Sequence, residues 1–158
     1  MSKTNSNAAK TWFFPPYLVA GSLILSFILE NFIYSTMLSQ GSVTQFTIGL
    51  IIIITSVVLF YYTFILFKSN AENPHPRSVT TQLFLGGPYK YSRNPIYLAF
   101  VLILFGCGIC FNSIWYIIFA ILELFLLHYG IVLPEEKYLE KEFDKVYLEY
   151  KNSVRRWI

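Results

Sequence analysis

Long apolar runs are the most regular feature of the chain. Residues 46–67 are 22 consecutive positions without a charge, and a helix needs about 20 apolar residues to cross the hydrocarbon core of a bilayer. Residues 17–38 form a second run of the same length, which carries Glu30 and Asn31 toward its second half. Each run therefore predicts one transmembrane helix.

A third run covers residues 96–133, and its only acidic or basic side chains are Glu123 and His128. Its 38 residues are too many for one span and suit two spans joined by a tight turn. The polar pair at 112–113 is the natural place for that turn. The fold class we expect is all-α integral membrane, with four transmembrane helices over about 16–38, 46–67, 95–111 and 114–133.

The basic residues test this topology independently. All twelve Lys and Arg fall in three places, namely the first ten residues, residues 68–93 and the stretch beyond 133. The loops at 39–45 and 112–113 contain none. Four spans place all three basic segments on one side of the membrane, as the positive-inside rule requires. We therefore expect a multi-pass protein with both termini in the cytoplasm, and the first ten residues do not have the pattern of a signal peptide.

Composition excludes several other classes of protein. The 158 residues are 55% apolar and 13% charged, whereas soluble domains average about 45–50% and about 25%. Such a chain cannot remain disordered, and a net charge of +3 is too dilute for a nucleic-acid binder. The two cysteines, Cys107 and Cys110, lie in an apolar run without nearby charge, which favours close helix packing over a disulfide or redox role.

Two segments outside the predicted spans have their own patterns. Residues 69–94 are rich in proline and glycine, which predicts a loop with fixed turns rather than a long helix. Residues 134–156 predict an amphipathic C-terminal helix that begins at Pro134, with acidic residues at the positive end of its dipole. The apolar positions of this helix recur at steps of three and four: Leu139, Phe143, Val146, Tyr147, Tyr150, Val154 and Trp157.

The two segments together resemble a known superfamily. Residues 83–98 read LFLGGPYKYSRNPIYL, similar to the L-x-x-x-G-x-Y-x-x-x-R-H-P-x-Y signature of isoprenylcysteine carboxyl methyltransferases and phospholipid methyltransferases. The second motif of that superfamily is also present, as Glu135-Glu136-x-x-Leu139 followed by Phe143, Tyr147, Tyr150 and Val154-Arg155-Arg156. The resemblance covers about residues 70–158, and two separate motifs in the right membrane context make it specific.

The resemblance implies a single membrane domain, residues 1–158, that transfers a methyl group from S-adenosyl-L-methionine to a lipophilic acceptor. This acceptor would be isoprenylcysteine carboxylate-like or another lipid-like small molecule, and the enzyme would resemble an isoprenylcysteine carboxyl O-methyltransferase. The resemblance also implies a pocket facing the cytoplasm, between the proline-rich loop and the C-terminal helix, with a lateral opening to the bilayer. The cofactor-binding residues that it implies, together with the adjacent Glu136, are Gln82, Leu83, Tyr89, Asn94, Pro95, Ile96, Tyr97, Glu135 and Glu136.

The chain departs from the superfamily at two positions. Asn94 replaces the usual histidine, a variant that resembles the bacterial branch and suggests the bacterial inner membrane. Ile131 replaces the arginine that animal isoprenylcysteine enzymes use for their substrate, which argues against a prenylcysteine carboxylate as the acceptor.

The residue types fit methyl transfer, in which the enzyme mainly aligns the reactants and excludes water. Glu135 or Glu136 could pair with the ammonium of the cofactor, and Arg93 or backbone N–H groups could bind its carboxylate. We expect Arg93 and His128 to be the catalytic candidates, His128 as a general base if the acceptor is an amine or hydroxyl. No cluster of side chains has the spacing of a metal site, so no metal is expected.

Two other functions fit parts of the pattern. Membrane sterol reductases that bind NADPH are similar toward the C-terminus, but they should have more spans and extra basic residues. A non-catalytic membrane interaction protein could retain the fold. The residues leave open the methyl acceptor, the oligomeric state and the roles of Glu30 and Glu123.

Overall fold

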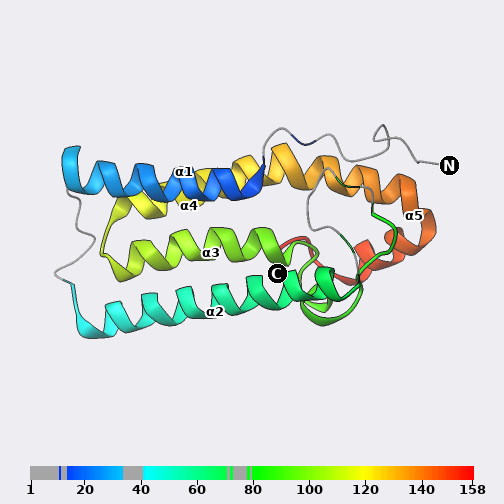
Figure 1. Cartoon of the computed structure of the whole chain (residues 1–158), viewed down its shortest axis with the longest axis horizontal. Helices are drawn as coiled ribbons and strands as arrows, with labels where there is room; N and C mark the ends of the chain where they lie inside the picture. Colours follow the sequence, from blue (N-terminus) through cyan, green and yellow to red (C-terminus); the bar gives the residue numbers. More distant parts are fainter. Residues whose placement is uncertain (1–10, 12–13, 34–40, 71, 73–77, 79) are drawn as a thin grey trace.

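The computed structural model describes residues 11, 14–33, 41–70, 72, 78 and 80–158, and the secondary structure of this part is helical, without a strand. Four helices lie side by side along the long axis of the molecule (Figure 1). In chain order the elements are α1 (Pro15–Ile28), the π-helical turn η2 (Leu29–Ile33), α2 (Val43–Ser69), the 3-10 turn η3 (Gly87–Lys90), α3 (Pro95–Cys110), α4 (Ile114–Leu127), the π-helical turn η4 (His128–Val132) and α5 (Leu133–Ser153).

Three helices in the described part are long and apolar enough to cross a membrane: Pro15–Phe32, Val43–Ser69 and the continuous helix Ile114–Ser153. The apolar helix α3 has 16 residues and falls short of that length. A span at 95–111, and with it the count of four, therefore stays a prediction. The predicted first span reached residue 38, and its last part, 34–38, lies outside the described residues.

Between Ile114 and Leu133 the long helix carries only Glu123 and His128 as acidic or basic residues, whereas charged residues are frequent beyond Leu133. The change from apolar to charged sequence therefore falls at the first turn of α5. Asp144 then interrupts α5 with φ 43° and ψ −119°. The chain turns back there toward α3 (Figure 1), and an ion pair between Lys151 and Glu140 joins the two arms across the bend. The amphipathic helix predicted over 134–156 corresponds to α5, which bends at Asp144 and ends at Ser153.

Small residues bring α2 and α3 into close contact. A Cβ atom added to Gly49 would lie 2.4 Å from the backbone nitrogen of Cys110, and one added to Gly106 would lie 3.2 Å from the carbonyl oxygen of Gly49. The side of Gly108 is filled by Ile117 of α4. Cys107 and Cys110 are both free thiols. The small residues of α3 therefore serve helix packing.

The core next to the charged end of the bundle joins α1, α3 and the α4–α5 helix. Its buried residues include Val19, Tyr97, Leu127 and Ile131, and Trp157 packs against them. At the opposite end, the predicted turn at 112–113 connects α3 to α4 (Figure 1). There the Ser113 hydroxyl donates to Glu30 at 2.5 Å, which gives Glu30 a structural partner.

Candidate functional site

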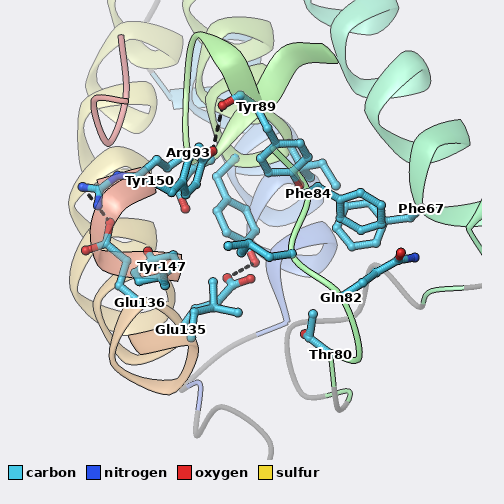
Figure 2. A pocket seen from close by; sticks show the side chains of 15 residues that line it. Phe67, Thr80, Gln82, Phe84, Tyr89, Arg93, Glu135, Glu136, Tyr147 and Tyr150 are labelled. Atoms are coloured by element: carbon cyan, nitrogen blue, oxygen red, sulfur yellow. Dashed lines mark hydrogen bonds and ion pairs between the residues drawn. The ribbon is translucent and has the colours of Figure 1, made fainter. Parts of the chain in front are cut away.

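A pocket of about 670 Å³, its mouth included, lies where α2 ends, α3 begins and α5 leaves the bundle. The charged side chains lie on one side of the pocket and the rings of Phe67 and Phe84 on the other (Figure 2). The lining residues are Phe67, Thr80, Gln82, Leu83, Phe84, Tyr89, Arg93, Asn94, Ile96, Tyr97, Glu135, Glu136, Leu139, Tyr147 and Tyr150.

Hydrogen bonds connect Thr80 and Gln82, on the aromatic side of the pocket, to α5 and to the C-terminal end of α2. The side-chain amide of Gln82 donates to the carbonyl oxygen of Asn70 at 3.1 Å, just beyond α2. The backbone N–H of Thr80 donates to the hydroxyl of Tyr138 on α5 at 3.2 Å. Gly87 adopts a φ of +58°, and a Cβ there would lie 3.2 Å from the ring of Tyr62. The glycine of the GPY sequence therefore meets two requirements: it adopts the positive φ, and it leaves room for the ring of Tyr62.

Three rings form the aromatic wall, which we define as Phe67, Phe84 and Tyr89. The ring centroids of Phe67 and Phe84 are 4.7 Å apart, and those of Phe84 and Tyr89 are 6.0 Å apart in a stacked arrangement. These separations are typical of favourable aromatic pairs. The wall offers flat apolar faces to a planar ligand group.

Glu135 lies in the first turn of α5, opposite the first turn of α3. The hydroxyl of Tyr97 donates to its Oε2 atom at 2.8 Å. Burial raises the pKa of Glu135 to about 7, with a smaller contribution from the negative charge of Glu136, while the Tyr97 hydrogen bond acts in the opposite direction. A half-buried carboxylate that accepts one hydrogen bond is a suitable partner for a cationic ligand group.

Glu136 is instead engaged by two arginines. Arg156 binds it through two parallel hydrogen bonds of 2.9 Å, from Nε to Oε1 and from Nη2 to Oε2. Arg93 contacts Oε1 through Nη2 at 3.2 Å, and the side chains of Arg93 and Glu136 are only 7% and 6% exposed. The Nε and Nη1 atoms of Arg93 are buried and have no hydrogen-bond partner among the described residues.

The arm of α5 beyond Asp144 contributes two tyrosines, Tyr147 and Tyr150, to the lining of the pocket. Tyr150 donates its hydroxyl hydrogen to the carbonyl oxygen of Tyr89 at 2.8 Å, and Tyr147 is 1% exposed. Burial raises the pKa of both phenols, so they stay neutral. The bend at Asp144 brings both tyrosines to the pocket and places Tyr150 against the loop.

The structure brings most of the residues predicted from the sequence into this one pocket. Arg93 and eight of the nine predicted cofactor residues line it, the exception being Pro95, which is buried at the start of α3. His128 is also outside the lining, and its ring lies against those of Tyr129 and Trp157. Asn94 lines the pocket, and its side-chain amide donates to the carbonyl oxygen of Arg156 at 2.8 Å.

Six lining residues were not among the predicted cofactor contacts: Phe67, Thr80, Phe84, Leu139, Tyr147 and Tyr150. Leu139, Tyr147 and Tyr150 do belong to the second motif and to the apolar face of the tail, so that pattern could have pointed to them. Phe67 is the last residue of a long apolar run, and nothing distinguishes it there from a lipid-facing position.

Comparison with the curated proteins and with the solved structures gave no match. The model of the phospholipid methyltransferase family matches residues 44–146, which is more than half of the chain and contains α2, the loop, α3, α4 and the first arm of α5. The chain therefore belongs to the phospholipid methyltransferase family.

Proposed function

We propose that this membrane methyltransferase binds S-adenosyl-L-methionine in the pocket and methylates a lipophilic acceptor at the cytoplasmic face of the membrane. One observation carries the proposal. Two residues of opposite charge line the same pocket: Glu135, a half-buried carboxylate, and Arg93, whose buried guanidinium has two nitrogens without a partner among the described residues. A zwitterionic amino-acid group is the ligand chemistry that satisfies both charges at once.

The residues fit the parts of this cofactor separately. Glu135 would bind the ammonium, because both oxygens of Glu136 already accept from Arg156. One unpartnered donor of Arg93, Nε or Nη1, would bind the carboxylate through a charge-assisted hydrogen bond. The aromatic wall would hold the adenine and face the sulfonium, which is a cation that aromatic rings attract.

The cofactor supplies a methyl carbon that its positive sulfur already activates for displacement. The chain's own contribution is then alignment and the exclusion of water. The arm with Tyr147 and Tyr150 covers one side of the pocket, and the loop tied to Asn70 and Tyr138 covers another. Loss of either cover would expose the reacting atoms to water.

The acceptor would approach from the bilayer. Ile96 and Tyr97, in the first turn of α3, connect the pocket lining to the apolar core of the bundle. The neighbouring Ile131 is fully buried in that core and offers no charge to a carboxylate. We therefore propose a lipid-like acceptor that is not held through an anionic group at this position.

The test is methyl transfer in membranes that contain the protein. We expect label from methyl-tritiated S-adenosylmethionine to appear in an organic-soluble product, and Glu135→Gln to abolish this transfer. Glu149→Gln removes a carboxylate from an exposed position of α5 and serves as the matched control with full activity. Equal transfer by Glu135→Gln and the unaltered protein would refute the assignment.

A further inference from the structure

We propose that Arg156, which lies outside the pocket lining, is a positioning residue that keeps the guanidinium of Arg93 available for the carboxylate of the ligand. This role rests on the proposed cofactor site. It concerns Arg156, Glu136 and Arg93, which form a chain of contacts from the back of the pocket to its lining.

Glu136 forms the better hydrogen-bond geometry with Arg156 than with Arg93. Arg156 takes both carboxylate oxygens at 2.9 Å, whereas Arg93 reaches only Oε1, at 3.2 Å and through a single nitrogen. The pKa of Arg156 is raised, mainly by its hydrogen bonds to Glu136, so its charge is secure. Because Arg156 bonds to both oxygens of Glu136, the Nε and Nη1 atoms of Arg93 keep no hydrogen-bond partner within the described part of the chain.

The charges lead to the same conclusion. Two guanidinium groups and one carboxylate leave the group of three with a net charge of +1. Without Arg156, the Arg93–Glu136 pair would be neutral. Both oxygens of Glu136 could then accept hydrogen bonds from two adjacent nitrogens of the Arg93 guanidinium. A buried guanidinium paired in that way offers little to an anionic ligand.

The chain after α5 holds Arg156 in place independently of its side chain. The carbonyl oxygen of Arg156 accepts the amide of Asn94 at 2.8 Å, and the carbonyl of Arg155 accepts the backbone N–H of Arg93 at 3.1 Å. Trp157 packs against the core. These backbone and core contacts persist when the Arg156 side chain is replaced, so a substitution there tests the guanidinium rather than the fold of the segment.

The experiment compares two probes in detergent-purified protein by calorimetry. S-adenosylhomocysteine carries the amino-acid group, and 5′-methylthioadenosine lacks it. We expect Arg156→Met to weaken S-adenosylhomocysteine binding roughly tenfold or more, because hydrogen bonds to a charged group are worth at least that factor. Binding of 5′-methylthioadenosine should change less than twofold. Arg155→Met, at the exposed neighbouring side chain, is the matched control and should affect neither probe.

A second variant tests the route through Glu136. In a Glu136→Gln background the carboxylate that would capture Arg93 is gone, so adding Arg156→Met should change S-adenosylhomocysteine binding less than twofold. Equal weakening of both probes by Arg156→Met would show a merely structural role and overturn the inference, as would a full tenfold loss in the Glu136→Gln background. If the unaltered, folded protein bound neither probe, the proposed cofactor site itself would fall, and the role of Arg156 with it.

Discussion

Lowering the pH from 7 to 6 should weaken the binding of S-adenosylhomocysteine through the carboxyl group of Glu135. Burial raises the pKa of this carboxyl to about 7, against the opposing effect of the hydrogen bond from Tyr97. The ammonium of the ligand binds the carboxylate and not the neutral acid. Protonation of Glu135 therefore competes directly with the ligand.

The magnitude follows from the fraction of Glu135 that is ionised. A carboxyl with a pKa of about 7 is half ionised at pH 7 and about one-tenth ionised at pH 6, so Kd should rise roughly fivefold. The amino group of the ligand stays protonated in this range, because α-amino groups titrate at about 7.7–8.0. The raised pKa has the opposite consequence for the ligand-free protein, whose stability should fall as the pH rises from about 4.5 to about 7.

The assay is calorimetric titration of detergent-purified protein at a series of pH values. Glu135→Gln should bind weakly and without this pH dependence. Tyr97→Phe removes a hydrogen bond that lowers the pKa of Glu135, so its midpoint should move to higher pH. The reasoning would be refuted by an affinity that stays constant from pH 7 to pH 6, or by the same pH dependence in Glu135→Gln.

Three further substitutions, with Gly21→Ala as a control for the first, test the fold and the aromatic wall. Gly49→Ala should destabilise the bundle by about 1–3 kcal/mol, because its Cβ would lie 2.4 Å from the backbone of Cys110; Gly21→Ala, with open space around it, should not lower Tm in thermal unfolding. Asp144→Gly should raise Tm, since relief of the positive φ is worth about 1 kcal/mol or more; an unchanged or lower Tm would contradict the strain. Phe84→Ala should weaken S-adenosylhomocysteine binding roughly tenfold or more, and unchanged calorimetric affinity would exclude the wall as the adenine site.

Hydropathy predicts most of the helices because an apolar run long enough to cross a bilayer is typical of a transmembrane helix. The expected helix at 46–67 lies inside α2, and the polar pair at 112–113 lies in the α3–α4 turn. The shape of the tail could not be predicted. Its apolar positions at steps of three and four continue through Asp144 without a proline or glycine to mark the bend. The reversal depends on contacts far away in sequence, such as that of Tyr150 with Tyr89.

The candidate site, like the fold, could be predicted from the sequence only in part. The motifs identified both glutamates, because they are adjacent at a helix start, but sequence alone does not separate their roles. In the structure, Glu136 forms ion pairs with Arg93 and Arg156, whereas Glu135 accepts a hydrogen bond from Tyr97. That distinction arises from the rotation of α5 relative to α3, which depends on packing and not on the order of residues.

The most direct test of the central claim is equilibrium binding of S-adenosylmethionine to the folded, detergent-purified protein, with NADPH as the control ligand. We expect saturable binding at one site per chain, loss of that binding in Glu135→Gln, and no binding of NADPH. Absence of S-adenosylmethionine binding in folded protein, or binding that Glu135→Gln leaves intact, would contradict the assignment of this pocket.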